Sequence, residues 1–266
     1  IVAAPGTQLL LPMTAALAKK GQAVILSPTY AEHRRAAAIA GHVPVETSEI
    51  ADLDTADLAI VVNPNNPDGR VIGRTELLDL ATRLEARDGM LVVDEAFMDV
   101  CARDESLVGH TDERRLVVLR SFGKFYGLAG IRLGFAVAPQ HLAATLRDRL
   151  GPWAVSGPAL DIGFAALSDA PWRHSMRRQL AEEATQLDAL LADFGLPTTG
   201  GTSLFRLVRT SDAQAVFRTL GKAGIFVRAF ERDRQLLRFG IPGREEDFAR
   251  LHVALDGWRR DRTGKT

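Results

Sequence analysis

A lysine in a glycine-rich loop between two apolar segments is the residue of this chain best suited to chemistry. Lys124 follows the apolar residues 116–119 and precedes 131–137, and Arg132 lies eight positions after it. Lysine is almost never buried without a partner, and loss of water favours its neutral amine. A neutral amine can attack an aldehyde to form a Schiff base, whereas an ordinary solvated loop lysine would have no such role.

Three further polar segments are suited to binding a phosphate monoester. Gly6, Thr7 and Gln8 lie between an expected strand and an expected helix, where free backbone N–H groups and the helix dipole favour an anion. Arg132 adds a forked cation and Ser121 adds a hydroxyl. Each alone is more typical of a helix cap or a structural residue, but together at neighbouring strand ends they indicate a phosphate site.

Other residues at strand ends are suited to a planar ring with a protonated nitrogen. Asp94 ends the apolar strand 90–93, and a buried carboxylate needs a cationic or hydrogen-bonding partner. Tyr30 could stack on the ring, and two prolines in the turn 63–69 could hold an asparagine amide at a fixed angle. The alternatives are a capping or salt-bridged aspartate, a core tyrosine and a simple rigid turn.

Two arginines near the C-terminus lie within apolar strands. Arg228 and Arg238 would be costly there without an anion, and together they suggest a dianionic substrate such as an amino acid with a second acidic group. Internal salt bridges to Glu231 or Asp233 are the alternative.

Short apolar strands alternate with helices in the first part of the chain, which predicts an α/β fold. We expect a three-layer α/β/α domain with a mixed, mostly parallel sheet, in which ligands bind beyond the carboxyl ends of the strands. The expected strands cover 22–27, 42–47, 58–62, 90–93, 116–119 and 131–137, and the expected helices cover 7–20, 29–40, 75–88 and 140–150. The residues described above therefore meet at one edge of the sheet.

The pattern changes after Pro139 and predicts a second, smaller domain. Helices over 157–168 and 171–194 precede a glycine-containing linker at 197–201. A small α+β domain follows, with strands at 203–208, 224–229 and 235–239 and helices at 212–221 and 244–258. We expect a large domain over 1–150, a helical connection over 151–196 and a small domain over 197–266.

Composition excludes several classes of protein. Lys+Arg and Asp+Glu both number 33, so the overall charge does not favour nucleic acid or an acidic membrane. Cys101 is the single cysteine, which excludes an internal disulfide, and no Cys/His spacing is typical of zinc sites. A cytoplasmic enzyme is expected. The chain opens within a strand-like segment, and we expect a lead-in before Ile1.

Taken together, these segments resemble the fold-type-I pyridoxal-phosphate enzymes of the class I/II aminotransferases across nearly the whole chain. The matching pieces are Gly6-Thr7-Gln8, Pro28-Thr29-Tyr30, Asn63 to Gly69, Asp94-Glu95-Ala96, Ser121-x-x-Lys124, Arg132 and Arg238. Asp68 replaces the threonine usual in the family's Asn-Pro-Thr-Gly turn.

The resemblance implies a role for each site residue. Lys124 would bind the aldehyde of pyridoxal 5'-phosphate and shuttle protons, and Asp94 would pair with the pyridinium nitrogen. Asn66 would hydrogen-bond the phenolic oxygen, Tyr30 would stack on the ring, and Arg238 would bind a carboxylate. The phosphate would be held by Gly6, Thr7, Gln8, Ser121 and Arg132.

Within the family, residues 94–99 and 120–130 are most similar to the threonine-phosphate decarboxylases of cobalamin synthesis. Aminotransferases usually have tyrosine where this chain has Phe97. The resemblance implies decarboxylation of threonine phosphate by a homodimer, and from the balanced charge we expect neither nucleic acid nor membrane as a partner. A histidinol-phosphate type of aminotransferase is the alternative, as is a non-catalytic module that binds pyridoxal phosphate. A nicotinamide dehydrogenase is excluded because Gly-x-Gly-x-x-Gly is absent.

Overall fold

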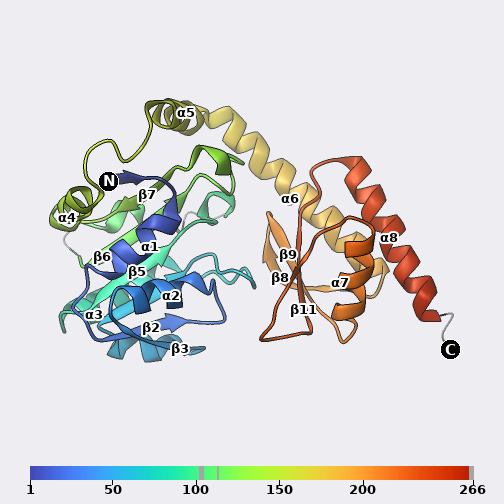
Figure 1. Cartoon of the computed structure of the whole chain (residues 1–266), viewed down its shortest axis with the longest axis horizontal. Coiled ribbons are helices and arrows are strands. Elements are labelled where there is room, and N and C mark those ends of the chain that lie inside the picture. Colours follow the sequence, from blue (N-terminus) through green and yellow to red (C-terminus); the bar gives the residue numbers. More distant parts are fainter. Residues whose placement is uncertain (102–104, 113, 264–266) are drawn as a thin grey trace. The chain divides into compact units, whose positions relative to one another are not determined.

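The computed structural model describes residues 1–101, 105–112 and 114–263, and its contacts divide the chain into two compact units (Figure 1). The first unit contains residues 1–66 and 70–169, and the second contains 67–69 and the chain from 170 onward. This division differs from the expected boundaries at 150 and 196. The long helix α6 (Ala170–Asp193) belongs to the second unit because its Leu187 and Leu191 lie in the same core as Leu237.

A seven-stranded sheet forms the centre of the first unit, and the expected mixed, mostly parallel sheet is confirmed. The five strands β2 to β6 run parallel to one another, and β7 is antiparallel to both β6 and β1. The spatial order is β1 (Val2–Ala4), β7 (Gly134–Val137), β6 (Leu116–Ser121), β5 (Met90–Asp94), β4 (Leu58–Val62), β2 (Gln22–Leu26) and β3 (Val43–Thr47).

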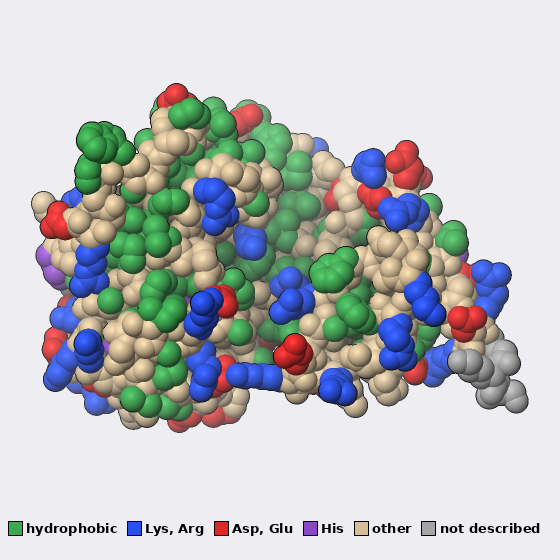
Figure 2. Space-filling view, viewed as in Figure 1, with side chains coloured by type: hydrophobic (Ala, Val, Ile, Leu, Met, Phe, Trp, Pro, Cys, Tyr) green, Lys and Arg blue, Asp and Glu red, His purple; other side chains and the backbone are tan. Residues whose placement is uncertain are grey.

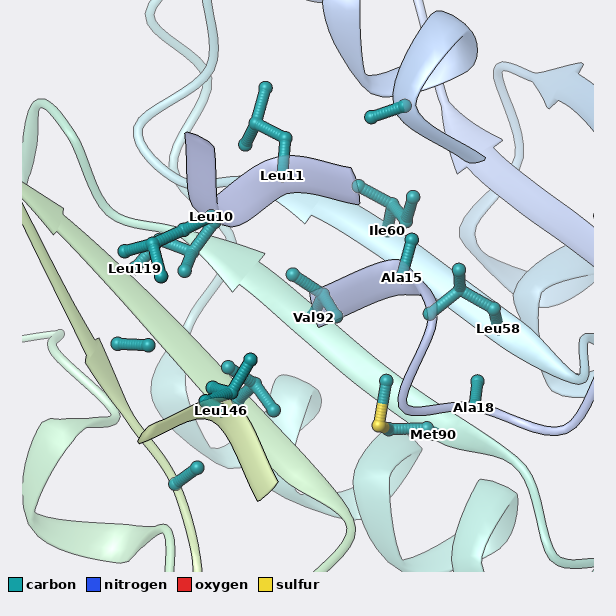
Figure 3. Close-up of a cluster of buried hydrophobic side chains, with 14 of the residues drawn as sticks. Leu10, Leu11, Ala15, Ala18, Leu58, Ile60, Met90, Val92, Leu119 and Leu146 are labelled. Carbon is teal, nitrogen blue, oxygen red and sulfur yellow. The ribbon is translucent and has the colours of Figure 1, made fainter. Parts of the chain in front are cut away.

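Helices cover both faces of this sheet because successive strand residues point to opposite sides. On one face, Met90 and Val92 of β5 share a core with Leu10, Leu11 and other residues of α1, α2 and α4 (Figure 3). On the other face, the intervening strand residues pack against α3. The helices are α1 (Thr7–Ala15), α2 (Glu32–Ile39), α3 (Arg74–Glu85), α4 (Gln140–Leu150) and α5 (Gly157–Ser168), with 3-10 turns η1 (Ile50–Thr55), η2 (Met98–Val100), η3 (Val108–His110) and η4 (Ala129–Ile131).

The second unit packs helices on a four-stranded antiparallel sheet, as the predicted small α+β domain requires. The sheet order is β10 (Arg228–Ala229), β11 (Leu236–Gly240), β9 (Phe205–Arg209) and β8 (Thr198–Thr202). The helices α6, α7 (Ala213–Lys222) and α8 (Glu245–Thr263) supply the rest of its core.

The prediction of a linker at 197–201 was wrong, since β8 occupies this segment. The glycines allow close backbone packing: a Cβ on Gly200 would lie 2.3 Å from the carbonyl oxygen of Asp68, and the Gly201 N–H donates to that oxygen at 2.7 Å. Residues 67–69 therefore belong to the second unit, whereas the residues on both sides of them, up to Asn66 and from Arg70, belong to the first.

Other element boundaries also differ from the prediction, among them the strand predicted over 224–229, which is confined to 228–229, and the helix predicted over 244–258, which continues to 263. Helix α1 ends at Ala15 rather than near residue 20, three residues after Pro12. The strand expected from 131 begins at Gly134, because η4 and the left-handed Arg132 (φ 54°) precede it.

Candidate active site

The carboxyl ends of β1, β2, β4, β5 and β6 lie along one edge of the first unit's sheet, as the parallel pairing requires. Residues predicted to do chemistry follow each of these ends. The sequence-predicted groups of the first unit are thus brought to one place.

The guanidinium of Arg132 lies against the loop that begins α1. Gly6 has φ 87° and ψ 155°, and a Cβ added to it would lie 2.6 Å from Nη2 of Arg132. A Cβ on Gly134 would lie 2.6 Å from the backbone nitrogen of Thr7, so β7 packs closely beneath this loop. Ser121 is buried and pairs with Gly134 across the sheet. These residues form a cationic cradle beside a helix N-terminus, which suits a phosphate group.

Asp94 is buried at the end of β5, and both of its carboxylate oxygens accept hydrogen bonds. Oδ1 accepts from the Ala96 N–H at 3.0 Å, and Oδ2 lies 2.9 Å from Nε2 of His33 on α2. The predicted buried carboxylate is therefore present, together with a buried histidine that the sequence analysis missed. Its signal was the spacing from Tyr30: the helix predicted over 29–40 would place a residue three positions further on the same side.

Tyr30 connects the N-terminal ends of α1 and α2. Its hydroxyl donates to Oε1 of Gln8 at 3.1 Å, and Nε2 of Gln8 donates to Glu32 at 2.9 Å. The Tyr30 ring meets the His33 ring edge-on, with centroids 6.0 Å apart, and the residue is 41% exposed. A partly exposed ring next to the Asp94–His33 pair has a face on which a planar ligand can stack.

The turn after β4 uses two of its asparagines to hold the backbone. The Asn63 amide exchanges two hydrogen bonds with the backbone of Ile72, at 3.0 and 2.9 Å. The Asn65 amide donates to the Pro28 carbonyl at 2.9 Å and accepts from the Thr29 hydroxyl at 2.6 Å. Asn66, the predicted ligand, follows with a half-buried side chain.

The expected burial of Lys124 was wrong, because its side chain is exposed. The lysine follows the end of β6 at the sheet edge, where Phe122 and Phe125 turn into the core and the intervening side chain points outward. Its Nζ lies 5.6 Å from the ring centroid of the buried Phe97, three residues after Asp94. The amine is therefore beside an apolar ring rather than enclosed by protein.

The loop that carries Lys124 is well supported. The Phe122 and Tyr126 rings stack with centroids 4.4 Å apart. The Gly127 N–H donates to the Lys124 carbonyl at 3.0 Å, and the Leu128 N–H donates to the Phe122 carbonyl at 3.2 Å. Ring packing and these hydrogen bonds thus hold the backbone of the loop that carries Lys124.

Arg228 and Arg238 lie opposite each other on β10 and β11 of the second unit. Burial and the neighbouring Arg228 lower the pKa of Arg238, whose guanidinium lies 5.0 Å from the Phe205 ring centroid. Asp233, one expected salt-bridge partner, instead pairs with Arg209 at 2.6 Å. Two adjacent arginines on one sheet are suited to an anionic ligand.

Other kinds of site find little support in the described residues. No group of three or more His, Cys, Asp or Glu side chains among them could hold a metal ion. None of the described helices combines the length and apolarity needed to cross a membrane. Basic and acidic side chains are interspersed on the face shown in Figure 2.

Comparisons with known proteins agree with this geometry. A family model for aminotransferase class I and II matches residues 1–254. The threonine-phosphate decarboxylase of Pseudomonas aeruginosa is 41% identical over 257 residues, covering 96% of this chain and 77% of the relative. The corresponding protein of Sinorhizobium sp is 43% identical over 255 residues, covering 94% and 75%.

A solved structure with the same fold is similar over nearly the whole chain. Histidinol-phosphate aminotransferase from Sinorhizobium meliloti, in complex with pyridoxal-5'-phosphate, has a TM-score of 0.87 and 22% identity, covering 98% of this chain and 76% of that one. The chain therefore belongs to the class I and II aminotransferase family of pyridoxal-phosphate-dependent enzymes.

Proposed function

We propose that the protein decarboxylates L-threonine O-3-phosphate to (R)-1-amino-2-propanol phosphate in cobalamin biosynthesis, using pyridoxal 5'-phosphate. The observation that carries the proposal is the identity with two proteins named threonine-phosphate decarboxylase, which extends over both units of the chain. The proposal includes a homodimer, which the family resemblance implies, and a cytoplasmic location.

The residues at the sheet edge fit this cofactor. The cradle of Gly6, Ser121 and Arg132, with the N-terminal residues Thr7 and Gln8 of α1, suits its phosphate. The buried Asp94 suits a protonated pyridine nitrogen, and its contact with His33 holds the carboxylate in place. Tyr30 would stack on the ring and Asn66 would hydrogen-bond its phenolic oxygen.

The substrate's anionic groups would be held by Arg228 and Arg238. A carboxylate and a phosphate are two separate anionic groups, and two opposed arginines can each bind one of them. We propose that these two arginines together bind the phosphate and the carboxylate of the substrate. Their task is to orient the bond between Cα and the carboxylate so that this bond breaks rather than the one between Cα and hydrogen.

Decarboxylation leaves an electron pair on Cα that must be stabilised and then protonated. When bound, pyridoxal phosphate supplies the electron sink for that pair. Asp94 keeps the ring nitrogen protonated, which is the condition for that sink. Lys124 would supply the amine that holds the cofactor aldehyde. Once the substrate's own amine has displaced it, the freed and protonated lysine would deliver a proton to Cα in place of the carbon dioxide that has left.

Phe97 supports the choice of decarboxylation over transamination. Its ring lacks the hydroxyl that aminotransferases usually carry at this position, so Asn66 alone would donate a hydrogen bond to the phenolic oxygen. The phenylalanine ring instead lies beside the Lys124 amine and is buried.

The direct test is a product assay. Purified protein with pyridoxal phosphate and O-phospho-L-threonine is expected to release carbon dioxide and form aminopropanol phosphate in equal amounts. Unphosphorylated L-threonine is the control for recognition of the phosphate. Formation of glutamate from histidinol phosphate and 2-oxoglutarate, without carbon dioxide release, would favour the aminotransferase alternative, and absence of both reactions would favour a non-catalytic binding module.

A further inference from the structure

A buried cluster of charges lies on the face of the sheet opposite the candidate active site. Side chains alternate along β5 and β6, so Asp94 and Ser121 point toward the side covered by α1 and α2. Glu95, which follows Asp94, and Arg120, which precedes Ser121, therefore point to the opposite face of the sheet. Glu95 is completely buried, and Asp99 is buried beside it.

The Glu95 carboxylate accepts hydrogen bonds from three donors. Oε2 accepts from the Ser106 hydroxyl at 2.6 Å and from Nη1 of Arg120 at 3.2 Å, and Oε1 accepts from the Leu107 N–H at 2.7 Å. Burial raises the pKa of Glu95, while these donors act in the opposite direction. A buried carboxylate with this set of donors is held in one position.

Arg120 bridges two carboxylates with the two arms of its guanidinium. Nη1 contacts Glu95 and the Ser106 hydroxyl, and Nη2 makes a short hydrogen bond to Asp99. The Glu95 N–H also donates to the carbonyl of Leu119, the residue before Arg120, at 2.9 Å. The ends of β5 and β6 are thus joined by backbone and by side chains at the level of the site.

We infer that Arg120, with Glu95 and Asp99, forms a positioning network that fixes the loop of Ser121 and Lys124 relative to Asp94. The inference rests on the proposed use of those three residues in cofactor binding. Arg120 is one residue from Ser121 and four from Lys124, and Glu95 directly follows Asp94. Any shift between the two strand ends would therefore change the spacing between the groups for the cofactor's phosphate, aldehyde and ring nitrogen.

The shape of the arginine is what the network needs. A planar fork can hold two carboxylates at once, whereas a lysine provides a single point charge. Arg120→Lys therefore keeps the charge and loses the bridge. Asp99→Asn is a milder variant, since it removes one charged arm and leaves Glu95 and its donors in place.

The residue that leads into β6 offers a control arginine. Arg115 precedes β6 at the end away from the site, and its Nη1 pairs with Asp88 at 2.9 Å. Its side chain is 27% exposed, against 22% for that of Arg120. Arg115→Lys thus perturbs a paired, half-buried arginine without touching the site.

Two measurements on cofactor-free protein test the inference without requiring catalysis. The first is the dissociation constant for pyridoxal phosphate, and the second is hydrogen–deuterium exchange of a peptide covering residues 121–128. We expect Arg120→Lys and Asp99→Asn to weaken cofactor binding, Arg120→Lys by roughly 10- to 100-fold, and to accelerate exchange in that peptide. Arg115→Lys should leave both within about twofold of the parent protein.

The network would be purely structural if Arg120→Lys and Asp99→Asn lowered the melting temperature but left both measurements like those of Arg115→Lys. Should Arg120→Lys fail to fold, the result for Asp99→Asn decides. Loss of decarboxylation with unchanged cofactor affinity and exchange would also overturn the inference. Failure of the parent protein to decarboxylate threonine phosphate would contradict only the proposed function.

Discussion

Replacing Gly6 by alanine should lower both the stability of the protein and its affinity for pyridoxal phosphate, through two separate effects on the loop that begins α1. The backbone of Gly6 (φ 87°, ψ 155°) lies in a region that residues with a Cβ rarely adopt. The new methyl group would also lie 2.6 Å from Nη2 of Arg132, which is closer than two such atoms can approach. The guanidinium is the far end of a flexible side chain, so we expect it to move out of the cradle.

The two effects differ in size and in the quantity that they change. Backbone strain should lower the free energy of unfolding of the cofactor-free protein by about 1–3 kcal/mol. Loss of the charged hydrogen bonds between Arg132 and the phosphate should cost a further 1.5–3 kcal/mol, roughly, in cofactor binding. That free energy corresponds to a Kd for pyridoxal phosphate that rises roughly 10- to 150-fold.

Urea unfolding and cofactor titration measure the two effects, and Gly151→Ala is the control. Gly151 has a similar backbone (φ 71°, ψ 179°), and a Cβ there would meet no atom within 4 Å. The Gly151→Ala protein should therefore lose stability without losing affinity for the cofactor. In an Arg132→Ala background, Gly6→Ala should still destabilise but should hardly change the Kd. An undiminished loss of affinity in that background would refute a mechanism through the guanidinium.

Four other outcomes are expected. Burial, with Glu95 and Glu105 nearby, raises the pKa of Cys101 from 9.0 to about 11, so iodoacetamide at pH 8 should modify it roughly 100-fold more slowly than an ordinary thiol until the protein is unfolded. Burial raises the pKa of Glu95 above its ordinary 4.5. Between pH 4.5 and the raised value, the folded protein therefore keeps a proton on Glu95 that the unfolded chain releases. Urea midpoints of the parent protein relative to Glu95→Gln should therefore fall as pH rises from 4.5 toward the raised value and level off above it, and a rise would contradict this direction. Borohydride reduction should attach the cofactor to the Lys124 peptide by mass spectrometry, and Lys124→Ala should carry no such adduct. Arg238→Gln should raise the KM for threonine phosphate roughly tenfold or more while bound cofactor, measured by absorbance, stays unchanged.

Most of the fold could be predicted because the strands of a sheet buried on both faces are short, continuous apolar segments. Residues 58–62 form β4 with the predicted bounds, and 140–150 and 157–168 form α4 and α5 as predicted. The order of these segments implied the parallel sheet, and the sheet implied that the polar groups after its strands would meet.

Two errors arose where a local sequence pattern has more than one structural explanation. Gly200 and Gly201 indicated a flexible linker, yet they are small because the Asp68 backbone lies against β8. Apolar segments around Lys124 suggested that the lysine is buried, yet it lies in the loop after β6, where Phe122 and Phe125 are buried and the lysine is exposed.

The partners of the charged residues were the least predictable feature of the site. Asp94 and His33 are 61 positions apart, and Arg120 is 21 positions from Asp99. Sequence indicated that a buried carboxylate needs a partner, because the desolvation cost does not depend on where the partner comes from. Which residue supplies it depends on the register of β5 against β6 and on the side of the sheet that α2 covers. The carboxylate facing α2 meets a histidine beside a tyrosine suited to ring stacking, and the adjacent one meets an arginine that joins two strand ends. Neighbouring acids on one strand thus acquire different roles from the alternation of the strand itself.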